Sequence, residues 1–128
     1  MSTNRRMRRS RMESHYLKPR ILSRDNEGNT FPEYGTAVPF TGEVWQASGR
    51  VQAQMYGEKL AYVRNVKIQG DYSVRTDSKG TVYYDFTDGL TVCEKDGLCL
   101  DVGDDADPDY EIISSKPYKP LRLEAMRR

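Results

Sequence analysis

The stretch from Gly49 to Gly70 mixes two hydrophobic periods, and the predicted elements of the chain can be ordered around it. In its first half, Tyr56, Leu60 and Val63 recur at the i, i+4 and i+7 spacing of a helix face. In its second half, β-branched and polar residues alternate as they do in a strand. This pattern predicts a short helix that ends near Leu60, followed by a strand over residues 62–68.

Strands and turns are also predicted on the N-terminal side of this stretch. In chain order they are a strand over 16–24, a turn over 25–29, an irregular return over 31–34 and a strand over 36–47. Pro39 and Gly42 predict an edge position or a bulge for the second strand. We expect Trp45, the only tryptophan, to be a core residue, and Ser48 to cap the helix that follows.

A tyrosine-rich hairpin is predicted over residues 70–86, because turn residues separate two segments of period-two alternation there. The pattern fits a regular sheet hairpin or an arm that projects from the body and makes contacts. Under the second interpretation, removal of residues 71–86 would leave a folded monomer. A tight hairpin at Asp96-Gly97 and strands over 110–114 and 121–126 complete the chain.

Short strands, frequent turns and one short helix predict a mainly β fold. We expect a small antiparallel β-barrel or sandwich with one short helix and a projecting hairpin. At 128 residues the chain is long enough for one domain. We therefore expect a flexible arginine-rich arm over residues 1–14 and a single β-domain over residues 15–128.

The net charge of +1 conceals an uneven distribution. Five of the twenty basic residues precede Met12, which leaves fifteen basic against nineteen acidic residues, a net charge of −4, for the rest of the chain. The basic residues of the arm are Arg5, Arg6, Arg8, Arg9 and Arg11. Two hypotheses fit such an arm: it binds nucleic acid through the phosphates, or it docks on an acidic surface of a neighbouring protein.

An acidic stretch over residues 101–109 is a second candidate site. It contains Asp104, Asp105 and Asp107, and oxygen-rich loops can bind calcium. The EF-hand pattern is not met, because Ala106 and Ile112 occupy its glycine and final acidic positions. We favour a solvated loop that could receive a neighbour's arginine arm. A metal-dependent enzyme using this loop is the less favoured alternative.

No other pattern in the sequence indicates enzyme chemistry, a metal or a cofactor. The single histidine, His15, is expected on the surface at the start of the first strand, and no P-loop or dinucleotide motif is present. Cys93 and Cys99 are expected to face opposite sides of a hairpin as small buried residues, without a disulfide or zinc. No apolar run approaches the roughly 18 residues that cross a membrane. We expect a protein that is made and used in a reducing cytoplasm.

The order of these features resembles the small head-closure proteins of tailed bacteriophages, also called head–tail connector, head-completion or stopper proteins. The resemblance rests on residues 40–46 (FTGEVWQ), which lead into residues 49–62 (GRVQAQMYGEKLAY). It continues through residues 95–100 (KDGLCL), 108–114 (PDYEIIS) and 116–118 (KPY). It covers about residues 16 to 126.

The resemblance implies a structural virion protein of the phage neck, assembled in the host cytoplasm. Such a protein is a homo-oligomer, a hexameric or dodecameric ring that seals the DNA-filled head below the portal or adaptor. It offers a docking face to a tail terminator or tail-tube protein, and contact with packaged DNA is possible. The expected subunit or neighbour contacts are Met55, Tyr56, Leu60, Tyr62, Tyr72, Tyr83, Tyr84, Asp104, Asp105 and Asp107.

Overall fold

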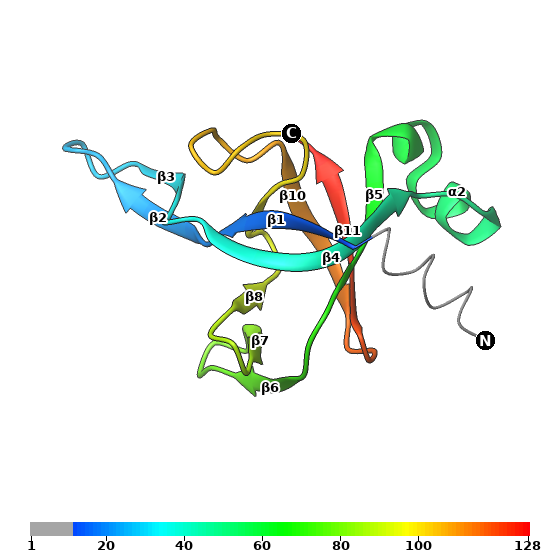
Figure 1. Cartoon of the computed structure of the whole chain (residues 1–128). Coiled ribbons are helices and arrows are strands. Elements are labelled where there is room, and N and C mark those ends of the chain that lie inside the picture. Colours follow the sequence, from blue (N-terminus) through cyan, green and yellow to red (C-terminus); the bar gives the residue numbers. More distant parts are fainter. Residues whose placement is uncertain (1–11) are drawn as a thin grey trace.

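A computed structural model describes residues 12–128, apart from the side chains of Ser23 and Pro32. Its centre is a closed barrel of six strands, paired antiparallel in the order β1-β4-β5-β11-β10-β9 (Figure 1). Their bounds are Glu13–Lys18 (β1), Val38–Gln46 (β4), Val63–Ile68 (β5), Gly97–Cys99 (β9), Tyr110–Lys116 (β10) and Leu121–Arg127 (β11). The predicted mainly β barrel with one short α-helix is therefore confirmed.

Alternation along the barrel strands separates the core from the outer face. In β11, Leu121, Leu123 and Ala125 are fully buried in the core, so Arg122 and Glu124 between them point outward. Val66 and Ile68 of β5 likewise point into the core. The strands predicted over 62–68, 110–114 and 121–126 are thus confirmed, with β10 extending to Lys116.

Strand β4 lies inside the barrel wall, and its predicted edge position was wrong. It pairs with β1 on one side and with β5 on the other. Pro39 is tolerated near its start, whereas Gly42 is required by close packing, because an added Cβ would collide with the carbonyl oxygen of Lys67. Trp45 lies on the outer face of this strand and is only half-buried, so its predicted core position was also wrong.

A three-stranded sheet packs below the barrel (Figure 1). It contains β6 (Tyr72–Thr76), β7 (Val82–Phe86) and β8 (Thr91–Cys93), so the predicted 70–86 hairpin exists. However, Tyr84 and Phe86 belong to the same buried cluster as the barrel interior. Removal of residues 71–86 would open this core, which contradicts the expectation that a folded monomer would remain.

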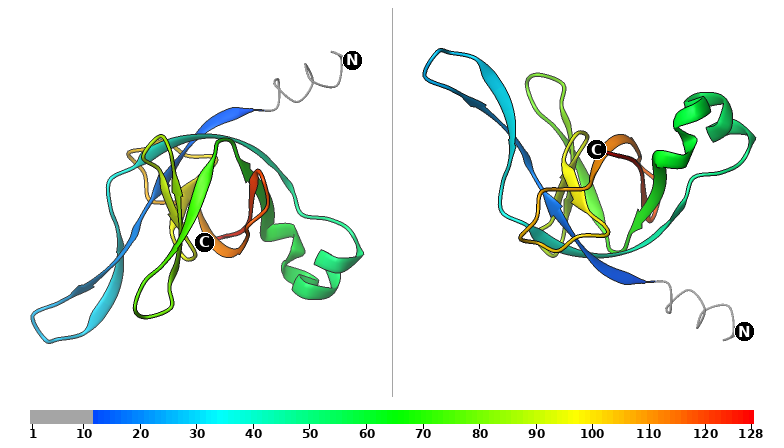
Figure 2. Two further views of the ribbon diagram at one scale, coloured as in Figure 1. Left: turned by 90° about the horizontal axis from the view of Figure 1, so that it is seen from below. Right: turned by 90° about the horizontal axis from the view of Figure 1, so that it is seen from above.

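The hairpin that projects as an isolated two-stranded arm is formed by β2 (Arg20–Arg24) and β3 (Thr30–Tyr34). It extends away from the barrel in all views (Figures 1 and 2). The predicted strand over 16–24 is divided at Pro19, which has no backbone N–H to donate. The segment predicted as an irregular return is the regular strand β3, paired over its length with β2.

Between β4 and β5 the chain makes a helical excursion, α2 (Arg50–Tyr56) followed by the 3-10 helix η1 (Gly57–Tyr62). The N-cap of α2 is Gly49, not Ser48, and it lacks a side-chain cap. Gly57 ends α2 with a φ of 55°, a left-handed conformation that glycine adopts without steric cost. The helix predicted to end near Leu60 therefore ends as an α-helix at Tyr56, and 3-10 turns continue past Leu60 to Tyr62.

Three smaller predictions are corrected. His15 is buried against Phe40, because β1 turns this side chain toward the core. Asp96-Gly97 does not form a hairpin turn, since β8 and β9 belong to different sheets; Cys99 is buried and Cys93 is half-buried, both as free thiols. Strand β1 begins at Glu13, two residues inside the expected arm.

Within residues 12–128, no helix is long and apolar enough to cross a membrane.

Candidate interaction surfaces

The helical excursion is fixed to the barrel by a buried group of polar side chains. Gln52 of α2 donates to Asn65 Oδ1 at 2.6 Å and to Glu124 Oε2 at 2.7 Å, and its own oxygen accepts from Asn65 Nδ2 at 3.2 Å. Tyr56 donates to the other oxygen of Glu124 at 2.9 Å. Asn65 and Glu124 are direct cross-strand partners on the outer face of β5 and β11. These hydrogen bonds fix the helix to the barrel.

This anchor changes the role expected for Tyr56. Burial, together with its hydrogen bond to the Glu124 carboxylate, raises the pKa of Tyr56 to about 12. Its hydroxyl is therefore occupied inside the subunit. Sequence patterning missed Gln52, Asn65 and Glu124, because polar residues at strand and helix positions give no periodic signal of burial.

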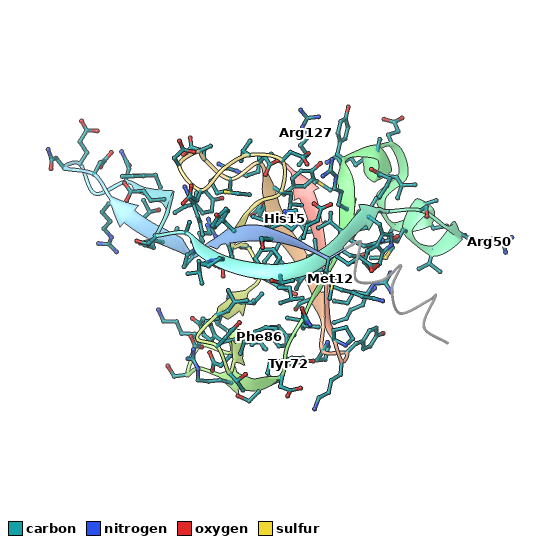
Figure 3. The ribbon with its side chains drawn as sticks, viewed as in Figure 1. Met12, His15, Arg50, Tyr72, Phe86 and Arg127 are labelled. Carbon is teal, nitrogen blue, oxygen red and sulfur yellow. The ribbon has the colours of Figure 1, made fainter. Side chains whose placement is uncertain are left out.

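The same excursion presents an apolar surface to solvent, which we call the helical patch: Val51, Met55 and Tyr62. These side chains are 69%, 59% and 52% exposed. Val51 and Met55 are one helical turn apart, so they share a face of α2. Of the residues expected at a subunit contact, Met55 and Tyr62 are thus available, whereas Leu60 is half-buried. Arg50 extends into solvent at the start of the helix (Figure 3).

A second exposed apolar surface lies on the projecting β2–β3 hairpin. It consists of Ile21 and Phe31, which are 48% and 38% exposed and lie on the same face of the hairpin, and we call it the hairpin patch. Leu22, 64% exposed, points to the opposite face. A two-stranded hairpin is only marginally stable in water unless it packs on another surface. The sequence predicts a strand for Ile21 and Leu22 but an irregular return for Phe31, and it gives no sign that they are exposed. Their position in a segment with no third strand is visible only in the fold.

The two patches lie on opposite sides of the barrel. The β2–β3 hairpin lies to the left of the barrel and the α2–η1 excursion to its right in each view of Figures 1 and 2, although both lean toward the same edge in Figure 2. One subunit therefore cannot cover its own patches with each other. Two different surfaces on opposite sides suit head-to-tail association of identical copies.

The tyrosines expected at an interface on the three-stranded sheet have different surroundings. Tyr84 is 5% exposed and its hydroxyl lies 3.0 Å from Ser115 Oγ, so it is a core residue and cannot supply an external contact. Tyr72 is half-buried beside Phe86 and donates to the carbonyl oxygen of Tyr118 at 2.6 Å (Figure 3). Tyr83 is half-buried beneath the Arg75 guanidinium, 4.3 Å from the ring centroid.

The acidic loop between β9 and β10 is partly occupied by internal contacts. Asp101 forms an ion pair of 2.9 Å with Arg64, and Asp109 accepts the backbone N–H groups of Leu100 and Asp101. Asp104, Asp105 and Asp107 are exposed, and their carboxylates have neither a hydrogen bond nor an ion pair within the described chain. Three charged groups of this loop are therefore free for an external partner.

The structure bears on the hypothesis of a metal site in the acidic loop, but it does not describe the arginine-rich arm. No group of three or more His, Cys, Asp or Glu side chains in residues 12–128 is arranged to hold a metal ion. The predicted arm contacts at Arg5, Arg6, Arg8, Arg9 and Arg11 lie outside the described residues.

Comparison of the chain with protein-family models, with curated proteins and with solved structures finds no match.

Proposed function

We propose that this chain is a ring-forming structural protein of the tailed-bacteriophage neck. In this role it closes the DNA-filled head below a portal or adaptor protein and provides the docking face for the tail. It acts in the virion as a hexameric or dodecameric ring, after assembly in the host cytoplasm, and it performs no catalysis.

The observation that carries the proposal is the pair of exposed apolar patches on opposite sides of a closed barrel. Apolar side chains that share an exposed face of a small domain mark a contact with another protein. When the two contacting surfaces differ, repeated association closes into a ring if the rotation between copies allows it. The sequence resemblance to head-closure proteins supplies the biological setting of that ring.

The first test is the mass of the purified protein in solution by light scattering, alone and with its portal-complex neighbours. We expect a species of six or twelve subunits, or assembly into such a ring when the portal complex is added. A protein that remains monomeric at high concentration and joins neither neighbour would contradict the proposal.

Substitutions then test the patches themselves. Met55→Glu and Ile21→Glu each place a charge in an exposed apolar patch, so assembly should weaken by about tenfold or more while the melting temperature is kept. Thr87→Glu is the control, because it adds the same charge at an exposed position outside both patches. Equal assembly by all three variants would exclude the patches as contacts.

A further inference from the structure

Three cations form a row across the outer face of the barrel. Lys67 in β5 is the direct partner of Arg122 in β11, and Arg122 is the direct partner of Lys116 in β10. Neighbouring strands are about 4.8 Å apart, so the three Cα atoms span roughly 10 Å. We call Lys67, Arg122 and Lys116 the basic row.

The aromatic ring of Trp45 supports two members of the row. Lys67 Nζ lies 5.5 Å from the centroid of this ring and Arg122 Cζ lies 5.2 Å from it. Cation–π contacts of this length orient the two cations on the half-buried tryptophan. They do not neutralise the charges.

No carboxylate forms an ion pair with the basic row within the described chain, although Lys116 lies close enough to Glu124 to interact with it electrostatically. The ion pairs among residues 12–128 are Arg64–Asp101 and Arg75–Asp85, and both lie elsewhere, as does the 3.7 Å contact between His15 and Glu13. Glu43 is the cross-strand partner of Lys67 but forms no ion pair with it. The buried Nε of Arg122 has no hydrogen-bond partner. Like charges placed directly opposite each other destabilise a sheet, so the row favours an external anion.

The basic row adjoins a concave surface that could admit a segment of chain. A cleft of about 730 Å³ has Lys67 in its wall, together with Lys119 and Tyr72. Its lining also includes Glu43 and Asp71, which balance the charges of the two lysines, so among the members of the row only Lys67 reaches this cleft.

The acidic loop and the basic row lie at opposite ends of β10 and β11. The loop leads into Tyr110, which pairs with Arg127, whereas Lys116 and Arg122 are at the far end of the same two strands. Figure 1 shows this loop at the top of the barrel and the β10–β11 connection at the bottom. Asp104, Asp105 and Asp107 therefore cannot reach the basic row of their own subunit.

We infer that the acidic loop of one copy docks on the basic row of the next copy. Three unpaired carboxylates at one end would neutralise three unpaired cations at the other, a heterologous contact that repeats from copy to copy. The inference rests on the self-association in the proposed function, and it identifies the charged part of that contact.

Reciprocal charge reversal tests this pairing. One variant carries Lys67→Glu, Lys116→Glu and Arg122→Glu, and the other carries Asp104→Lys, Asp105→Lys and Asp107→Lys. Each variant alone places like charges at the contact, so its self-association should weaken by about tenfold or more relative to the unaltered chain. An equimolar mixture should associate again, because each copy then meets an oppositely charged surface on both sides.

The measurements are light scattering over a concentration series at low and high salt, and thermal melting to check that each variant folds. Lys79→Glu with Lys95→Glu is the control, since both lysines are exposed and lie outside the row; this pair should associate as the unaltered chain does. Weakening of association by high salt is also expected, because exposed charges are screened.

The possible failures are distinguishable. If both reversed variants form the same assembly as the unaltered chain, or if the mixture of two folded variants fails to associate, the charge contact is wrong while the ring remains supported. If the unaltered chain never assembles, both the proposed function and the charge contact are wrong. If reversal of the row abolishes binding to a 30-base-pair DNA duplex but leaves the assembly mass unchanged, the row is a nucleic-acid site and the inference is overturned.

Discussion

Gln52 in the short helix donates a 2.7 Å hydrogen bond to Glu124, which lies 72 residues later on the outer face of the last strand. Glu124 is 1% exposed, and its carboxylate also accepts the Tyr56 hydroxyl. A buried carboxylate is costly unless its oxygens are hydrogen-bonded, and here both are. This contact holds the helical patch in position on the barrel.

Loss of that hydrogen bond should therefore destabilise the whole domain. Gln52→Ala removes one hydrogen bond from Asn65 and one from Glu124. Because both side chains are buried, water cannot replace these bonds, and the free energy of unfolding should fall by about 2 to 3 kcal/mol. Tyr56→Phe removes one hydrogen bond to a charged group and should cost about 1.5 kcal/mol. Urea denaturation measures both effects. Tyr62→Phe, at an exposed ring, is the control and should change stability by less than about 0.5 kcal/mol.

The three-stranded sheet should behave as part of the core. Phe86 is 6% exposed, and Phe86→Ala should lower the free energy of unfolding by about 3 to 5 kcal/mol through lost burial and the cavity it leaves. Val74→Ala, on the exposed strand β6, should cost less than about 0.5 kcal/mol. Chemical denaturation of the two variants checks the difference. Equal, small effects would mean that the sheet is a dispensable arm.

The packing of β4 against β5 makes a sharp prediction for Gly42. Gly42→Ala forces the new Cβ into the carbonyl oxygen of Lys67, which the strand pairing holds in place, so stability should fall by about 2 to 3 kcal/mol. Gly103→Ala is the matched control, because its Cβ would meet only the end of the exposed Asp105 side chain. Its melting temperature should remain close to that of the unaltered chain. A tolerated Gly42→Ala would contradict the close approach of the two strands.

Asp96 should make stability depend on pH. Burial raises the pKa of this carboxyl to about 6 from its usual 3.8, although the backbone N–H groups of Arg20 and Cys93 oppose the shift by donating to it. Between these two pKa values the folded state binds more protons than the unfolded state. Stability from this group is therefore full below about pH 4 and is lost as the pH rises through 6, by about 2 to 3 kcal/mol.

The contribution of Asp96 is isolated by comparison with Asp96→Asn, which cannot titrate. The unfolding free energy of the unaltered chain minus that of this variant should fall by about 2 to 3 kcal/mol from about pH 4 to pH 7. Other carboxylates titrate equally in both proteins and cancel. A difference that stays constant with pH would show that the carboxyl of Asp96 has an ordinary pKa.

Local sequence determined those elements whose neighbours along the chain suffice to define them. The alternation around Val66 and around Leu121 predicted β5 and β11, and the turn residues at Asp77 predicted the β6–β7 hairpin. In each case the residues that decide the conformation are only a few positions apart, and their propensities agree with the fold.

Tertiary structure decided which face of each element is covered. Period-two alternation assigns side chains to two faces but cannot say which face receives another layer, so Tyr84 is in the core whereas Trp45 is on the outside. Barrel closure depends on the pairing of β1 with β9, which are about eighty residues apart in the chain. The burial of Glu124, the isolation of the β2–β3 hairpin and the separation of the acidic loop from the basic row all follow from such long-range pairings, which no local pattern encodes.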